Sequence, residues 1–174
     1  MELFEAIARR HSYRGEYTDA KVSREDLTKI VQAGIQAPSG KNEQTTRFII
    51  VDDPEVLTDL ATIIDKPVAS TAPALIVCAV DLEPILAGIS FGPEDCAAAV
   101  ENMLLAITDL GYASVWLDGI LRFEDKAARV GMRLGVPDSL QVRVILPVGV
   151  AVKEGTQKEK LPFDQRAWFN AYGG

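Results

Sequence analysis

The sequence predicts one domain, residues 1–174, of a layered α/β or α+β class. The length suits a single domain with a substantial core. A content of 48% hydrophobic and 25% charged residues is typical of an ordinary globular protein. Four or five apolar segments with strand character alternate with segments of helical spacing. We therefore expect a central sheet covered by helices.

Periodicity and capping signals place the elements in order. Ser23 and Asp53 are expected to cap helices, Pro54 to begin one, and Pro38 and Gly111 to follow the ends of two others. The expected helices cover residues 2–10, 23–37, 54–64, 94–110 and 123–134. The expected strands cover 47–51, 74–80, 113–117 and 141–148, the first two of them buried.

Three further segments affect assembly and access. The helix at 94–110 is apolar almost all round, so it is either central or at an obligate subunit interface. Residues 82–93 predict a loop or short lid, and 65–73 a loop. A charged link at 153–160 precedes a final segment rich in aromatic side chains.

Composition excludes several functional classes. A net charge of -7 argues against nucleic-acid or anionic-membrane binding, and no apolar run is long enough to span a membrane. Residues 1–5 lack the features of a signal peptide, so we expect a cytoplasmic protein. Cys78 and Cys96 are expected to be buried and reduced, and with one histidine we expect no metal site.

A basic cluster follows the first helix. Residues 9–14 hold three arginines, the only histidine and a serine hydroxyl. Taken alone, they fit either a solvated helix end or a site for a phosphorylated ligand, because guanidinium groups match phosphate oxygens. There is no P-loop or G-x-G-x-x-G motif, and nothing indicates that His11 is the base of a catalytic triad. Residues 39–42, taken alone, indicate a turn.

Four segments together resemble the nitroreductase family of FMN-dependent oxidoreductases. They are Arg10–Arg14, Ala37–Gln44, Glu101–Ala106 with the following Leu110–Gly111, and Leu134–Pro137. The resemblance implies an α+β fold with a central, mostly antiparallel sheet flanked by helices. It also implies a domain-swapped homodimer with two FMN molecules at the interface and the segment at about 153–174 wrapping the partner subunit.

The resemblance also implies roles for individual residues. Those near the FMN phosphate and ribityl chain are Arg10, His11 and Ser12, completed by Lys158 and Lys160. Those near the flavin ring are Arg14, Asp118 and Gly119, with Pro38, Ser39, Gly40 and Asn42 reaching it from the other subunit. Those expected to line the substrate pocket are Lys41 and Phe91.

The implied activity is electron transfer from NADH or NADPH through tightly bound FMN to a small flat acceptor, such as a nitroaromatic or quinone, in a ping-pong cycle. The chain departs from the family pattern at Gln44–Thr46, where Gln-Pro-Trp is usual. Its segment between 51 and 74 has no clear counterpart of the family's mid-chain flavin contacts, and its lid is short. These departures leave alternatives open: an FMN storage or sensing module, a reductive dehalogenase, or a flavin-fragmenting enzyme.

Overall fold

A four-stranded antiparallel sheet forms the centre of the protein. The computed structural model describes residues 1–83 and 86–173, so part of the expected lid, residues 84–85, lies outside the described residues. The strands follow the order β1-β2-β4-β3, and every neighbouring pair is antiparallel. The prediction of a mostly antiparallel sheet is therefore confirmed. The strands are β1 (Thr46–Val51), β2 (Ala74–Asp81), β3 (Ala113–Ser114) and β4 (Leu140–Gly149).

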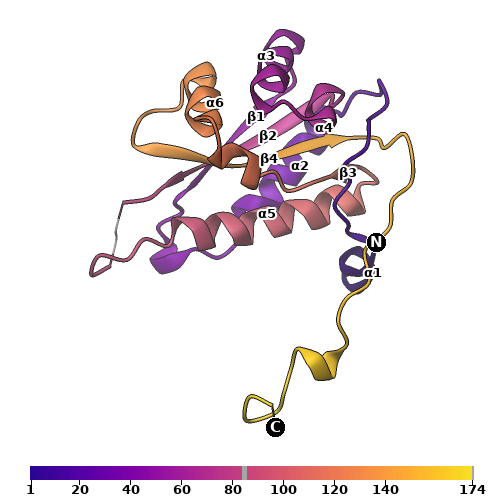
Figure 1. The fold of residues 1–174 in the computed structure, drawn as a ribbon, viewed down its shortest axis with the longest axis vertical. Helices are drawn as coiled ribbons and strands as arrows, with labels where there is room; N and C mark the ends of the chain where they lie inside the picture. Colours follow the sequence, from indigo (N-terminus) through magenta and orange to yellow (C-terminus); the bar gives the residue numbers. More distant parts are fainter. Residues whose placement is uncertain (84–85, 174) are drawn as a thin grey trace.

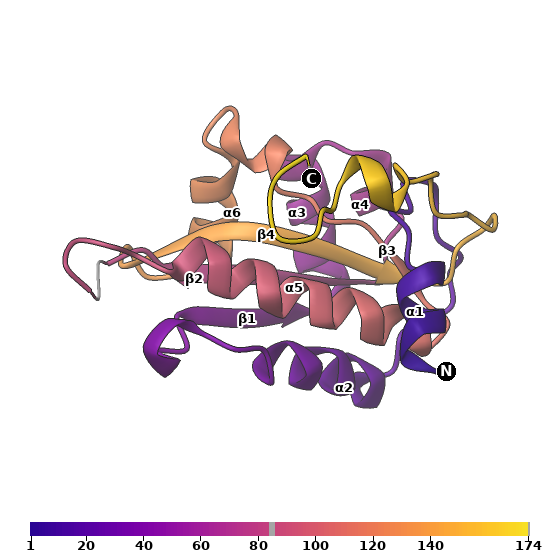
Figure 2. The same ribbon diagram turned by 90° about the horizontal axis from the view of Figure 1, so that it is seen from below.

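Helices cover both faces of this sheet. One layer contains α2 and α5, and the other contains α3, α4 and α6, as Figures 1 and 2 show. The helices are α1 (Leu3–Arg9), α2 (Arg24–Ile35), α3 (Pro54–Ile64), α4 (Pro67–Ser70), α5 (Gly92–Asp109) and α6 (Lys126–Leu134). Three 3-10 turns complete the described chain: η1 (Gly40–Asn42), η2 (Gly119–Arg122) and η3 (Phe163–Gln165).

The central strand β2 explains why the core forms on both sides. Its residues are nearly all fully buried, and they alternate between the two layers. Ile76 and Cys78 pack toward α2 and α5, whereas Leu75 and Val77 pack toward α3 and α6. A register shift opposite Cys78 leaves Arg143 of β4 as an extra residue, which is the signature of a β-bulge.

The capping signals of the sequence are confirmed. The Ser23 hydroxyl oxygen accepts a hydrogen bond from the Asp26 amide at 3.0 Å. Asp53 accepts from two amides of the first turn of α3 at 3.0 and 3.1 Å. Both caps satisfy amides that have no partner within the helix, so they fix where α2 and α3 begin.

Several elements differ from the sequence prediction. The strand β1 is an edge strand and only partly buried, because β2 protects it on one side. The strand at 113–117 is short: after Ser114 the chain meets β4 again only through a bridge at Leu117. Residues 67–70, expected in a loop, form α4. The helix expected at 123–134 begins at Lys126, because Glu124 and Asp125 both have a φ of 53°, which does not fit a right-handed helix.

Apolar side chains remain exposed at both ends of the chain. On α1, Leu3 and Phe4 are 61% and 83% exposed. The C-terminal segment extends away from the sheet in Figure 1, and its Phe169 and Tyr172 are also exposed. Large apolar side chains exposed in this number make the two ends of the chain candidates for an interaction face. Within the described residues, no helix is long and apolar enough to cross a membrane.

Candidate functional site

The basic cluster lies where α1 meets the C-terminal segment. The Arg10 guanidinium forms an ion pair with Glu101 of α5, with 3.4 Å between Nε and Oε1. The side-chain amide of Gln157 donates hydrogen bonds to the carbonyl oxygens of Arg10, at 2.8 Å, and Ile7, at 3.1 Å. These oxygens lie at the end of α1, which explains why they need a donor from outside the helix. Lys158 therefore follows directly after a residue bonded to Arg10.

His11 faces the C-terminal segment. Its Nδ1 lies 3.0 Å from the Arg9 carbonyl oxygen, so Nδ1 carries the hydrogen of this bond. Its Nε2 is buried and has no hydrogen-bond partner in the described part of the chain. A Cβ added to Gly155 would lie only 2.4 Å from Nε2, so this glycine packs directly on the imidazole. The ring therefore packs on the C-terminal segment.

A cavity lies beside Arg14. It has a volume of about 380 Å³ and is lined by Arg14, Lys66 and the segment from Trp116 to Ile120. A Cβ added to Gly119 would meet nothing within 4 Å, so the backbone there borders open space. The cavity thus brings together two cations, an aromatic side chain and an accessible backbone turn.

The Asp118 carboxylate is turned toward Arg122. Both of its oxygens accept hydrogen bonds from the guanidinium, at 2.8 and 2.7 Å. This interaction, with a smaller contribution from Arg143, lowers the pKa of Asp118 below its ordinary value although partial burial opposes the shift. Asp118 is therefore ionised at neutral pH and is poorly suited to act as a proton donor.

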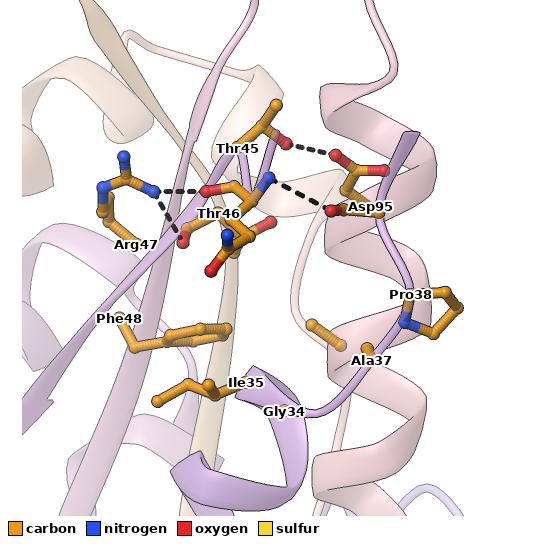
Figure 3. Close-up of a pocket in the computed structure, with 12 residues that line it drawn as sticks. Gly34, Ile35, Ala37, Pro38, Thr45, Thr46, Arg47, Phe48 and Asp95 are labelled. Atoms are coloured by element: carbon orange, nitrogen blue, oxygen red, sulfur yellow. Dashed lines mark hydrogen bonds between the residues drawn. The ribbon is translucent and has the colours of Figure 1, made fainter. Parts of the chain in front are cut away.

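The loop after α2 borders another cavity, of about 290 Å³, which Figure 3 shows. Pro38 and Ser39 line it together with Phe48 of β1 and Asp95 of α5. Phe91 packs on Gly40, since a Cβ at Gly40 would lie 2.5 Å from the phenyl ring. The expected pocket residues Lys41 and Phe91 are therefore neighbours of the same glycine.

Within one chain, the loop at 38–42 lies far from the basic cluster that follows α1. The loop at 38–42 bonds to the first turn of α5 through Asp95, whereas the amino group of Met1 pairs with Asp109 at its other end. Fourteen helical residues at about 1.5 Å each separate these points by roughly 21 Å. Figure 2 shows α1 and the turn that follows α2 at opposite ends of α5.

Three residues of these surroundings were not predicted from the sequence. Lys66 lies in a segment expected to be a loop, Gln157 in a charged link, and Asp95 in the first turn of the helix expected at 94–110. The Lys-Pro pair at 66–67 was the one usable signal, because proline often opens a helix and fixes the residue before it. Among the described residues, none of the ion pairs involves Arg14, Lys66, Lys158 or Lys160.

Comparison with known proteins adds independent information. A model of the nitroreductase family matches residues 7–80 and 64–150. A protein of Archaeoglobus fulgidus, provisionally named NADH dehydrogenase/NAD(P)H nitroreductase, is 36% identical over 152 residues, covering 85% of this chain and 84% of the relative. An NADPH-dependent oxidoreductase of Staphylococcus haemolyticus is 29% identical and covers 98% of this chain and 74% of the relative. The solved FMN-dependent nitroreductase of Clostridium difficile is 28% identical with a TM-score of 0.82, covering 97% of this chain and 99% of that chain.

Proposed function

This chain belongs to the nitroreductase family, and on that premise we propose that it is an FMN-dependent oxidoreductase that uses NADH or NADPH to reduce a small flat acceptor. The observation that carries the proposal is a set of cations that form no ion pair within residues 1–83 and 86–173. Arg14 and Lys66 line the cavity, and Lys158 and Lys160 lie on the C-terminal segment. In a protein of net charge -7, such a local set suits an anionic ligand.

The phosphate of FMN would bind at the end of α1. Arg10 and Ser12 come from the α1 side, and Lys158 and Lys160 from the segment that Gln157 ties to Arg10. Each charge-assisted hydrogen bond contributes about 1.5–3 kcal/mol. Three of them would supply much of the roughly 8 kcal/mol that corresponds to micromolar affinity. The donor set therefore fits a phosphate dianion.

The flavin ring would lie along the cavity beside Arg14. Arg14 and Lys66 would face the electron-poor end of the ring, where a cation favours the reduced, anionic form and raises the reduction potential. The backbone at Asp118 and Gly119 borders open space and would supply a donor to the reacting edge of the ring. Lys66 would then supply a mid-chain flavin contact, for which the segment between 51 and 74 shows no clear counterpart in sequence.

A second copy of the chain would complete this site. The loop holding Pro38, Ser39, Gly40 and Asn42 lies at the other end of α5 from α1, so a partner subunit is the natural source of that loop. The exposed apolar face of α1 and the aromatic C-terminal segment support the same homodimer, with the segment wrapping the partner. In this arrangement His11 positions the C-terminal segment, and Lys41 and Phe91 border the acceptor.

FMN, when bound, supplies the redox chemistry that passes reducing equivalents from the nicotinamide to the acceptor. The protein supplies binding, orientation and charge, and Asp118 stays ionised throughout because Arg122 holds it. Membership of the nitroreductase family supports a flat acceptor of nitroaromatic or quinone type, which would bind between the flavin ring and the partner's loop.

The test is an absorbance spectrum of the freshly purified protein before and after addition of NADH or NADPH without air. We expect a flavin spectrum that bleaches with the reductant and returns when a quinone or nitroaromatic is added. A colourless protein that gains no flavin spectrum with added FMN would contradict the proposal. Bleaching without turnover would indicate a storage or sensing module, and loss of intact FMN during turnover with oxygen would indicate a flavin-fragmenting enzyme.

A further inference from the structure

Asp95 holds both ends of the loop after α2. Its carboxylate oxygen Oδ1 accepts a hydrogen bond from the Gly40 amide at 2.8 Å, and Oδ2 accepts one from the Thr45 hydroxyl at 2.7 Å. Figure 3 shows the bond from Thr45 crossing from the loop to α5. The residue itself is only 6% exposed. One buried side chain thus fixes two points of the chain that are five residues apart.

A buried carboxylate needs compensation, and these two donors provide it. Removing an ionised group from water is costly unless hydrogen bonds or counter-charges replace the lost hydration. Among the described residues Asp95 forms no ion pair, so Gly40 and Thr45 carry this task together with the amino end of α5, whose dipole favours a negative group. The carboxylate is therefore bound to the loop rather than to a cation.

The loop between these two points is strained. Lys41, Asn42 and Gln44 have φ angles of 55°, 59° and 52°, in the left-handed region that residues other than glycine rarely adopt. The Ser39 hydroxyl accepts a further hydrogen bond from the Gln44 amide at 3.1 Å. Such strained conformations persist only where surrounding contacts enforce them, and they cluster at functional sites.

Phe91 packs against the same loop. The Asp95 amide donates a hydrogen bond to the Phe91 carbonyl oxygen at 2.9 Å, and the Phe91 ring packs against Gly40. Gly40 has no room for a side chain, because an added Cβ would lie 2.5 Å from that ring. The loop and Phe91 therefore pack as one unit, and the Asp95 side chain is bonded to that unit through Gly40. The bond to the Phe91 carbonyl belongs to the backbone of α5 and does not depend on this side chain.

We propose that Asp95 is a positioning residue that holds residues 39–45 and Phe91 in the strained conformation in which they complete the partner subunit's flavin site. This inference rests on the proposed function, since the loop would serve a cofactor held by the other chain. Asp95 itself touches no cofactor in this arrangement. It acts through Gly40 and Thr45.

The experiment compares Asp95→Ala, Asp95→Asn, Thr45→Val and Thr45→Ser with the wild type. Hydrogen exchange of the amides at 39–45 in the FMN-free protein reads the loop directly, and fluorescence titration reads the dissociation constant for FMN. A matched control is Asp59→Asn. Asp59 is a carboxylate of α3 that pairs with Arg133 of α6, and both helices lie on the other side of the sheet from α5.

We expect Asp95→Ala to accelerate exchange at Gly40 and to weaken FMN binding, each by about tenfold or more. Asparagine should rescue part of both effects, because its oxygen can accept from Gly40 and its NH2 can donate to the Thr45 hydroxyl. Thr45→Val should show an intermediate loss, and Thr45→Ser should behave like the wild type because it keeps the hydroxyl.

The two readouts separate the inference from the function on which it rests. A wild-type protein that binds no FMN would defeat the proposed function, and loop exchange would still report whether Asp95 orders the loop. Unchanged exchange in Thr45→Val and Asp95→Asn would overturn the inference even if Asp95→Ala fails to fold. Faster exchange with unchanged FMN affinity would also overturn it, since the loop would then be ordered without serving the cofactor.

Discussion

The side-chain amide of Gln157 bonds to the carbonyl oxygen of Arg10 at 2.8 Å and so fastens the C-terminal segment to the end of α1. The same NH2 group reaches the Ile7 carbonyl oxygen at 3.1 Å. A single side chain thus joins two parts of the chain that lie 147 residues apart in the sequence. In the proposed site, this link determines whether Lys158 can act together with Arg10.

Replacing Gln157 by leucine should weaken FMN binding while leaving the fold intact. The variant keeps the bulk of the side chain but loses both donors, each worth about 0.5–1.5 kcal/mol. We expect a several-fold higher dissociation constant in fluorescence titration and faster proteolysis of the segment after residue 152. The matched control is Gln141→Leu on β4, and equal affinity of both variants would show that the link does not serve the cofactor.

The combination Arg10→Ala with Lys158→Ala tests the phosphate site itself. Removing two cations from a dianionic ligand should release most of the FMN, because charge-assisted bonds are the strongest that the site can form. The measurement is the flavin content of the protein after gel filtration. The control combines Lys21→Ala with Arg129→Ala, two exposed cations elsewhere, and should keep its flavin. Stoichiometric flavin in the variant that combines Arg10→Ala with Lys158→Ala would refute the phosphate assignment.

Local signals predicted most of the fold. The caps at Ser23 and Asp53, the apolar run of β2 and the glycine after α5 are features of a few neighbouring residues, so the sequence displays them directly. Where the prediction differed, tertiary context was the cause. The exposure of β1 depends on its place at the sheet edge, and the short β3 depends on where β4 stops pairing.

The proposed site could be assigned from the sequence only where its residues follow one another in the chain. Arg10 to Arg14 and the loop at 38–42 form contiguous motifs, so the family resemblance pointed to them, and their roles stay predictions. Asp95 and Gln157 bond to residues 55 and 147 positions away, and Lys66 lines its cavity with residues about 50 positions away. No local pattern marks such long-range contacts. Only the folded chain brings these residues to the site.

Replacing Glu101 by glutamine should tighten FMN binding. Glu101 pairs with Arg10 at 3.4 Å, so its negative charge both occupies the guanidinium and repels a nearby phosphate. Because the pair is partly exposed, we expect a gain of less than about fivefold, largest at low salt. Titration at two salt concentrations measures the effect. Weaker binding would instead show that Glu101 orients the guanidinium for its ligand.

Replacing Asp118 by asparagine should remove a pH-dependent part of the stability. Arg122 lowers the pKa of Asp118 in the folded protein, so the pair stabilises the fold above the unfolded-state pKa of about 3.9 and loses this effect as the pH falls through the folded-state value. The wild type should therefore melt slightly higher than Asp118→Asn at neutral pH. The difference should begin to shrink as the pH falls below about 4 and should vanish only below the lowered folded-state pKa. Thermal melts across this range measure it, and a difference that persists in acid would contradict the assignment.

Replacing Gly155 by alanine should dislodge the C-terminal segment. The new Cβ would lie 2.4 Å from His11 Nε2 and 2.8 Å from Cδ2, so either the ring or the segment must move. Overpacking of this kind costs about 1–3 kcal/mol, which here falls on a segment held mainly by Gln157 and the contact with His11. We expect faster proteolysis of the segment, weaker FMN binding and little change in Tm. The matched control is Gly131→Ala in α6, whose added Cβ would meet side chains at an ordinary 3.6 Å and should leave the segment in place. Adding His11→Ala to Gly155→Ala removes the imidazole ring. If this double variant regains FMN affinity, the clash lies at the imidazole, and if it does not, Gly155→Ala weakens FMN binding by another route.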